Sequence, residues 1–213
     1  MKNDTYPNRD LVMCYLCRME ITRESVMAAC AKLGHKYFEN GDFNVNIIGI
    51  RNSATGNKVT NAFDDWMTIS YKDNGVWKFF SWSATTDPGK DPMLRGNNGR
   101  GTARVVPGQY PGSHNIDLHQ GKYRALKQKG KLRLYRDADK DMEYDTDKVV
   151  DSFGDGINIH HAGADSVLIG EWSHGCQVFK RIKDFDAFMA IVEKSAKMHG
   201  NSFTYTLIES RDL

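Results

Sequence analysis

The segment from Gly156 to Phe179 constrains the fold most, because a short loop in it separates two chemically reactive side chains. Ile157-Asn158-Ile159 alternates apolar and polar residues, which is typical of a strand, and His160 follows directly. Cys176 comes after the loop, at the end of the run Ser-His-Gly-Cys. An imidazole next to a thiol can take its proton and leave the nucleophilic thiolate. We therefore expect the chain to fold Cys176 back toward His160.

The glycine before the cysteine suggests a second part of the same chemistry. Gly175 has no side chain beside the sulfur, so the backbone N–H groups of Gly175 and Cys176 are expected to face a developing oxyanion. A base, a nucleophile and a donor pocket are what acyl transfer requires. The alternative is that Cys176 is an inert packed residue, because cysteine is among the most buried residue types.

This pattern resembles the signature of the L,D-transpeptidase catalytic domain family (YkuD type), which has a histidine after a strand, a spacer, and then Ser/Thr-His-Gly-Cys. The resemblance implies that Cys176 is the nucleophile and His160 its base. It implies that His161 supplies a backbone carbonyl that orients the base. Gly175 joins these as a catalytic residue, and the implied substrate-binding residues are Ser173, His174 and Trp172.

Two features depart from the family pattern. The loop between His160 and Ser173 is somewhat shorter than is usual, and Val178 stands where the family has an arginine two positions after the cysteine. The family arginine recognises a substrate carboxylate, so the resemblance does not extend to that recognition. Other landmarks, such as the run from Asn46 to Asn52, look like those of phage and bacterial proteins related to the transpeptidases.

The resemblance implies an enzyme that acts on peptidoglycan stem peptides through a cysteine thioester. We expect an L,D-peptidase, similar to the cell-wall hydrolases called endolysins that phages use. One alternative is an L,D-transpeptidase that forms crosslinks. Others are a non-catalytic wall-binding or virion protein, and a cysteine hydrolase acting on another amide. None of these requires a cofactor or a metal.

The termini and charge pattern bear on location and partners. The N-terminal run MKNDTYPNRD is polar, so we expect no signal peptide, and no apolar run reaches the roughly 18 residues of a membrane span. This favours a protein made in the cytoplasm that acts at the bacterial cell wall. The stretch from Lys122 to Arg136 is basic, which would suit attraction to an anionic cell envelope or to nucleic acid. No nucleic-acid motif accompanies the charge, so a solvated face is favoured and we expect no nucleic-acid partner.

Periodicity predicts the α+β class, with a β-rich core and two packing helices. Residues 1–20 are expected to be an N-terminal extension, and residues 21–213 a single catalytic domain. One helix begins after the N-cap Thr22, and the other, capped by Asp184 or Asp186, ends at Gly200. Strands are expected near residues 43–50, 66–71, 76–82, 102–106, 131–135 and 202–208. Asp73-Asn74-Gly75 predicts a hairpin turn, residues 84–102 a long loop, and Pro107-Gly108 and Pro111-Gly112 breaks in strand structure. The family resemblance implies a β-sandwich-like arrangement.

Three other groups of residues suggest metal sites or cleft positions. Cys14, Cys17, Cys30 and His35 have a spacing that zinc sites use, but their apolar and helical context favours packing. Asp137, Asp139 and Asp141 alternate as in a calcium loop, although the glycine and distant glutamate of that loop are missing, and a solvated acidic turn is favoured. His114 and His119 are expected to point to opposite sides of a strand, where either could line the cleft but a surface position is the default.

Overall fold

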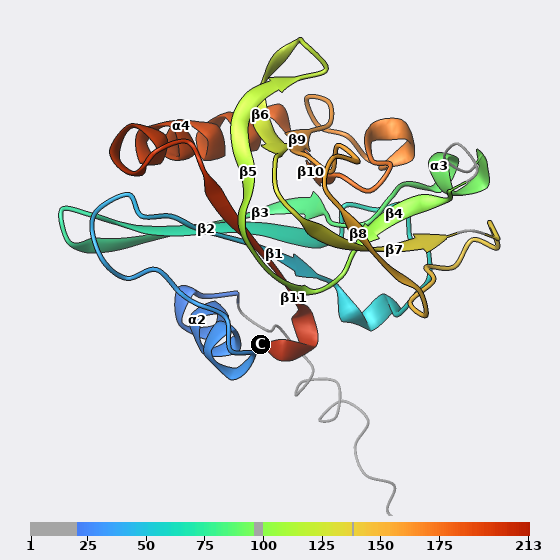
Figure 1. Cartoon of the computed structure of the whole chain (residues 1–213), viewed down its shortest axis with the longest axis horizontal. Helices are drawn as coiled ribbons and strands as arrows, with labels where there is room; N and C mark the ends of the chain where they lie inside the picture. Colours follow the sequence, from blue (N-terminus) through green and yellow to red (C-terminus); the bar gives the residue numbers. More distant parts are fainter. Residues whose placement is uncertain (1–20, 96–99, 138) are drawn as a thin grey trace, which may run out of the picture.

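The computed structural model describes residues 21–95, 100–137 and 139–213. Within these ranges the chain is rich in β-structure and has three α-helices, in agreement with the predicted α+β class. Eight strands form a mixed sheet that closes into a barrel (Figure 1). In order around the barrel they are β1 (Asn46–Arg51), β11 (Phe203–Glu209), β5 (Gly108–His119), β6 (Tyr123–Gln128), β9 (Ile159–His161), β10 (Gln177–Phe179), β3 (Val76–Thr85) and β2 (Asp65–Asp73). The expected extension, residues 1–20, lies outside the described residues.

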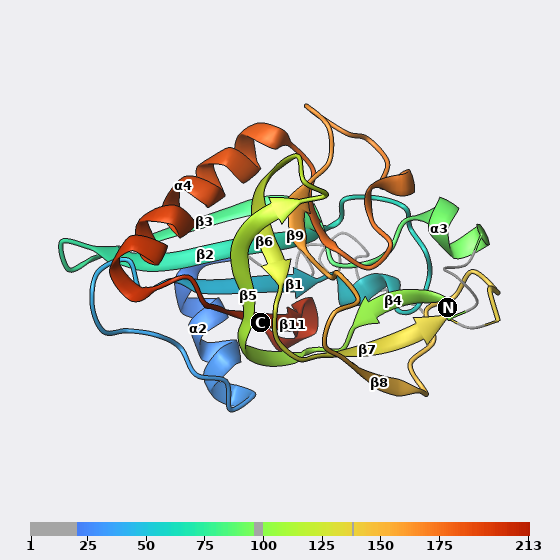
Figure 2. The same cartoon turned by 45° about the horizontal axis from the view of Figure 1, so that its top comes forward.

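Closure of the barrel differs from the sandwich-like arrangement that the family resemblance implied. The sheet closes because β1 pairs in parallel with β11 and antiparallel with β2, which joins the first and last described strands. Closure leaves no unpaired edge on the main sheet. A separate sheet of β4 (Thr102–Val105), β7 (Leu132–Asp137) and β8 (Val149–Ser152) lies beside the barrel (Figures 1 and 2).

The two longer helices cover different faces of the barrel wall, as Figure 2 shows for α2 (Arg23–Lys32) and α4 (Ile182–His199). All six residues of β1 are buried. Ile48 and Ile50 pack with Val26 and Cys30 of α2, whereas Ile47 belongs to the core that α4 completes. Because neighbouring side chains of a strand point to opposite faces, both faces of β1 bury apolar side chains, although the face of Ile47 also carries the buried Arg51.

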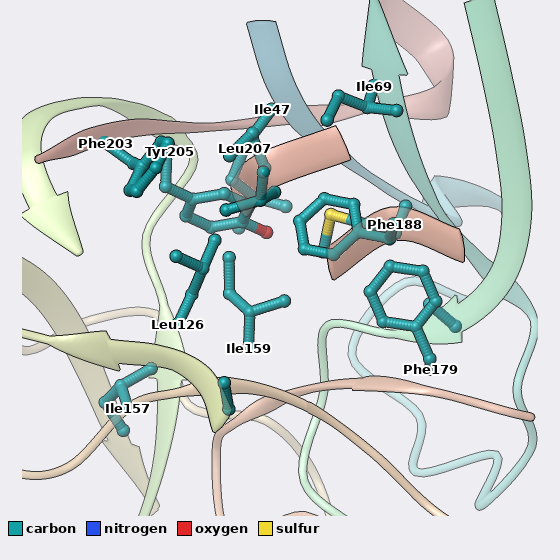
Figure 3. Close-up of a cluster of buried hydrophobic side chains, with 14 of the residues drawn as sticks. Ile47, Ile69, Leu126, Ile157, Ile159, Phe179, Phe188, Phe203, Tyr205 and Leu207 are labelled. Atoms are coloured by element: carbon teal, nitrogen blue, oxygen red, sulfur yellow. The ribbon is translucent and has the colours of Figure 1, made fainter. Parts of the chain in front are cut away.

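The core inside the barrel contains one polar contact that supports the pocket described below. Tyr205 is buried among aliphatic and aromatic side chains, and its hydroxyl donates to Oε1 of Gln177 at 2.7 Å (Figure 3). A Cβ atom on Gly49 would lie 2.2 Å from that hydroxyl oxygen. Gly49 therefore makes room for Tyr205, which anchors the residue directly after Cys176.

The N-cap predicted from the sequence is correct for α2 and wrong for α4. Thr22 caps α2 as predicted, because its side chain accepts from the N–H of Ser25 at 3.1 Å and the reciprocal bond is also present. The N-cap of α4 is Arg181, so the predicted cap at Asp184 or Asp186 is wrong. Asp184 lies in the first turn of α4, where the positive end of the helix dipole stabilises its negative charge.

The middle of the chain is more regular than its Gly and Pro content suggests. The Asn74-Gly75 turn between β2 and β3 forms as predicted, with positive φ at both residues. Strand β5, however, continues through Pro111, where the sequence predicts a break, and a register shift opposite residues 203–205 absorbs the irregularity. The long loop expected after β3 contains a short helix, α3 (Lys90–Arg95). No helix in the described part of the chain is long and apolar enough to cross a bilayer.

Candidate active site

A pocket of about 640 Å³ opens where the ends of β5, β6 and β9 meet the segment that leads into β10. Its wall includes five residues that the sequence analysis identified: His160, His161, Trp172, His174 and Cys176. It also includes His119, Tyr123 and Asn158, which had no assigned role in the site. The fold thus gathers chemically capable side chains from segments more than 50 positions apart in the sequence.

The parallel pairing of β9 with β10 brings the thiol and the imidazole into this pocket. Gln177 lies opposite Ile159, so the residues just before them, Cys176 and Asn158, also lie side by side. Side chains two positions apart on a strand point the same way, so His160 extends from the same face as Asn158. A register shift of one residue would turn Cys176 to the other face of the sheet.

Two backbone groups hold the thiol of Cys176. Its Sγ accepts from the N–H of Asn158 and donates to the carbonyl of Gly156, both at 3.4 Å. Burial raises the pKa of the thiol to about 11, and the Asn158 N–H offsets only part of that increase. The resting sulfur therefore keeps its proton at neutral pH. The N–H of Cys176 itself makes no hydrogen bond within the described ranges.

His160 is a neutral imidazole with a fixed orientation. Its Nδ1 lies 3.0 Å from the backbone carbonyl of His161, and because a carbonyl only accepts, Nδ1 carries the proton and Nε2 is left as an acceptor. Burial lowers the pKa of His160 to about 3, and repulsion from His119 adds to the effect. The carbonyl of His161 thus lies where the family resemblance implied it.

The thiol and the imidazole share the pocket but are not hydrogen bonded to each other in the described structure. The ring of His160 instead stacks on the ring of His119, with centroids 4.2 Å apart and planes 20° apart. The hydroxyl of Tyr123 lies 3.5 Å from Nδ1 of His160. Direct proton transfer from Cys176 therefore needs a change in side-chain geometry.

His119 and Asn158 are parts of the site that sequence analysis did not assign. Both are buried, and so is His114, so the surface position expected for the two histidines is wrong, whereas His119 lines the pocket, which was the alternative. The amide of Asn158 donates to Nδ1 of His119 at 3.1 Å, and its Oδ1 accepts from the N–H of Gln128 at 3.0 Å. The alternation in Ile157-Asn158-Ile159-His160 already placed Asn158 on the face of His160. The position of His119 required the barrel register.

Ser173 and Gly175 build the turn before Cys176 and do not line the pocket. Ser173 is fully buried, and its Oγ donates to the carbonyl of Cys176 at 2.8 Å and accepts from the N–H of Gly175 at 3.2 Å. A Cβ on Gly175, whose φ is +128°, would come within 2.5 Å of the Ala103 carbonyl oxygen. Ser173 is therefore a turn residue with no surface for substrate, and the Gly175 N–H is not free to bind an oxyanion.

Trp172 and His174 form part of the exposed rim of the pocket. Trp172 ends the short 3-10 helix Gly170–Trp172 and is 46% exposed. Nε2 of His174 lies 3.4 Å from a carboxylate oxygen of Glu171, which attracts the imidazole when it is protonated. Burial, followed by the charge of Arg95, lowers the pKa of His174. These side chains give the rim an apolar surface next to polar groups.

The predicted zinc spacing is only partly described by the structure. Cys14 and Cys17 lie outside the described residues. Cys30 is 1% exposed on α2 and packs against the outer face of β1, and burial raises the pKa of its thiol to about 11. Within the described ranges, neither Cys30 nor His35 belongs to a group of three or more residues arranged to hold a metal ion.

Comparison with known proteins does not assign the chain to a family. No protein-family model matches the sequence, and no curated protein or solved structure matches the chain. The likeness to the L,D-transpeptidases therefore rests on the short motif between Ile157 and Cys176.

Proposed function

We propose that the pocket is the active site of a cysteine-dependent acyl-transfer enzyme, with Cys176 as nucleophile and His160 as base. One observation carries this proposal: a thiol and a neutral imidazole lie in the wall of one open pocket, on neighbouring parallel segments. The backbone carbonyl of His161 fixes the imidazole so that Nε2 is its acceptor. Such a base, oriented by a third group, is a common arrangement for activating a nucleophile.

The first step is closure of the dyad. In this proposed step the Cys176 thiol leaves the Gly156 carbonyl and donates instead to Nε2 of His160. Hydrogen bonds of active sites often become well aligned only when substrate binds. The raised pKa of the thiol and the lowered pKa of the imidazole both keep the proton on sulfur at rest. Activation is thereby confined to the closed, substrate-bound state.

The chemistry that follows is acyl transfer at a peptide carbonyl. As the S–C bond forms, the thiol proton moves to Nε2 of His160, and the N–H of Cys176 stabilises the oxyanion. When the intermediate collapses, the C–N bond breaks and the proton moves from His160 to the leaving amine. This leaves a thioester on Cys176. His160 then takes a proton from the water that attacks the thioester carbonyl. The C–S bond breaks, the acyl group leaves as a carboxylic acid, and His160 returns the proton to the sulfur.

The substrate class that we propose is the stem peptide of peptidoglycan, cleaved at an L,D peptide bond at the bacterial cell wall. The support is the motif from His160 to Cys176, together with a rim that offers the ring of Trp172 to an extended peptide. An L,D-transpeptidase forms the same thioester and passes it to the amine of a second stem peptide. The two enzymes therefore differ in the acceptor rather than in the pocket.

In our proposal, the residue that binds a stem-peptide carboxylate is not at the position of the family arginine. Val178, at the position of the family arginine, is fully buried in β10 and cannot contact a substrate. Lys122 lies between β5 and β6 in the wall of the same pocket. We assign the carboxylate contact to its ammonium group, which binds as a point charge rather than in the bidentate way of arginine.

The test uses purified sacculi incubated with the full chain and analysed by mass spectrometry. We expect loss of crosslinks or of terminal D-Ala with the natural protein, and no change with Cys176→Ala. Cys30→Ala is the matched control, because this second thiol is buried on α2 and should leave turnover unchanged. Circular dichroism and a thermal melt check that both variants fold.

Each outcome separates the candidate functions. New crosslinks identify a transpeptidase, and water as the acceptor identifies a peptidase. Turnover that survives Cys176→Ala excludes the thioester mechanism. Binding of the natural protein to sacculi without any change in muropeptides favours a non-catalytic wall-binding protein.

A further inference from the structure

Three carboxylates converge at the loop that follows β7, away from the residues that line the cysteine pocket. Asp137, Asp139 and Asp145 each offer one oxygen, and these oxygens lie within 4.8 Å of one another. Like charges at this spacing repel one another, and a cation bound between them would relieve that repulsion. Exposed acidic turns are common without a metal, and a second observation is therefore needed.

That observation is the environment of Asp137, the last residue of β7. Its side chain is buried, with only 4% of the residue exposed. Oδ1 accepts from the N–H of Lys140 at 2.9 Å, but Oδ2 has no hydrogen-bond partner. Within the described ranges it is the only buried side-chain nitrogen or oxygen atom without one. A buried carboxylate oxygen is costly to leave unpaired, and a bound cation would supply the missing partner.

The chain returns to Asp137 because the residue before Asp145 is anchored. Tyr144 is buried, its hydroxyl donates to the carbonyl of Pro88 at 2.9 Å, and its N–H donates to the carbonyl of Asn57 at 2.9 Å. The guanidinium of Arg104 lies over its ring, 4.4 Å from the centroid. The position of Asp145 beside Asp137 is therefore fixed by the core, not by the loop alone.

The loop also explains why the predicted ligand Asp141 is replaced by Asp145. Oδ1 of Asp141 accepts from the N–H of Glu143 at 2.8 Å, and its side chain is exposed. Lys140 and Met142 both have positive φ, so the backbone turns sharply on either side of Asp141. The alternation of Asp137, Asp139 and Asp141 seen in the sequence does not survive as one ligand set.

We propose that Asp137, Asp139 and Asp145 bind a calcium ion. Calcium takes six to eight hard oxygen ligands in flexible geometry, so backbone carbonyls and water can complete a shell begun by three carboxylates. Zinc prefers nitrogen and sulfur ligands, and magnesium demands a near-ideal octahedron. The ion neutralises the cluster, pairs the buried oxygen and ties the end of β7 to the segment before β8. The site is independent of the activity proposed for Cys176.

The test is isothermal titration of calcium chloride into the metal-free full chain, followed by thermal melts with and without calcium. We expect one saturable site in the natural protein, and an affinity lower by about tenfold or more in Asp139→Asn and in Asp145→Asn. Asp139 is exposed, so its variant should fold even if a change at buried Asp137 does not. At the same calcium concentration, the melting temperature should rise more for the natural protein than for Asp145→Asn.

Asp141→Asn is the matched control, because it removes the same charge from the same loop and keeps the acceptor for the Glu143 N–H. Its affinity should stay within about twofold of the natural value if Asp141 is not a ligand. The absence of saturable calcium binding overturns the proposal. An equal loss in Asp141→Asn also overturns it, because general loop charge would then explain the binding. Tighter binding of magnesium than of calcium overturns the choice of ion.

Discussion

Two cavities of nearly equal size differ in the state of their polar groups. The pocket at Cys176 has a volume of about 640 Å³, and a second one of about 630 Å³ is lined by Arg51 and Arg104. In the first, a protonated thiol lies near a neutral imidazole. In the second, both guanidinium groups pair with Asp87, at 2.9 and 2.8 Å. Cavity size alone therefore does not identify the reactive site.

The arginine cavity carries its charge in a fixed network. Arg51 is 1% exposed and donates to the carbonyls of Val105 and Thr86, each at 2.9 Å, and to the Thr86 hydroxyl. Asp65 is buried in the same network, and burial together with the charge of Asp87 raises its pKa to about 7. These groups already have partners, which suits them to holding β1, β3 and β4 together. The protonated thiol of Cys176 and the neutral imidazole of His160 form no such charged network.

The largest effect that we predict breaks this network. Arg51→Met should lower the free energy of unfolding by about 3–5 kcal/mol, because Asp87 loses a buried partner and two carbonyls lose their donor. Cys176→Ala should cost only about 1 kcal/mol, because the thiol makes two weak contacts. Urea unfolding followed by circular dichroism measures both.

An exposed ion pair provides the control for Arg51. Arg124 pairs with Glu193 at 3.2 Å, and their side chains are 64% and 38% exposed, far more than that of Arg51 at 1%. Arg124→Met should change stability by about 1 kcal/mol or less. If Arg51→Met costs no more than Arg124→Met, the buried network does not stabilise the fold, and the contrast between the two cavities fails.

Features that depend on residues close in sequence could be predicted from the sequence, whereas contacts between residues far apart in the sequence could not. Three predicted features depend on residues close in sequence or on short periodic runs. These are the Thr22 cap, the Asn74-Gly75 turn and the placement of His160 and Cys176 in one pocket. The ion pair between Arg51 and Asp87 joins positions 36 apart, and no local pattern marks it. Such contacts depend on barrel register, which a single sequence does not fix.

Strand β5 illustrates the same limit at the candidate site. Its Pro111 and Gly112 are turn signals, so the sequence favours a break there. The barrel overrides that preference, because β5 pairs with β6 and β11 on its two sides. Once β5 is continuous, His119 reaches Asn158 and His160. The oxyanion role expected for the Gly175 N–H failed for a different reason, since a side-chain acceptor two residues away occupies it.

The second prediction concerns pH and His160. An unfolded histidine has a pKa near 6.5, whereas that of folded His160 is about 3. Between these pH values the unfolded state binds more protons, so the free energy of unfolding falls as pH falls. At pH 4 this loss amounts to about 3 kcal/mol relative to pH 7.5. The variant His160→Gln has no imidazole at this position, so it does not show this loss. At pH 4 its free energy of unfolding should therefore approach or exceed that of the natural protein.

Tyr123→Phe is the control for the pH experiment, because it removes a hydroxyl 3.5 Å from His160 and leaves every histidine in place. Urea unfolding at pH 4 and pH 7.5 should give the same pH difference for Tyr123→Phe as for the natural protein. If His160→Gln also shows the natural difference, His160 is not held neutral by the fold. The Cys176 pocket would then no longer differ from the Arg51–Asp87 network by holding its groups neutral.

The smallest predicted effect concerns substrate binding at the rim of the Cys176 pocket. This prediction rests on the proposed peptidase activity. Trp172→Ala should raise KM for a muropeptide by roughly fivefold, or about 1 kcal/mol, because the exposed ring offers apolar contact to the peptide. Stability should change by no more than about 0.5 kcal/mol. Phe153→Ala is the control, because Phe153 is 69% exposed but does not line the pocket. Equal changes in KM for both variants would place substrate binding outside the cavity at Cys176.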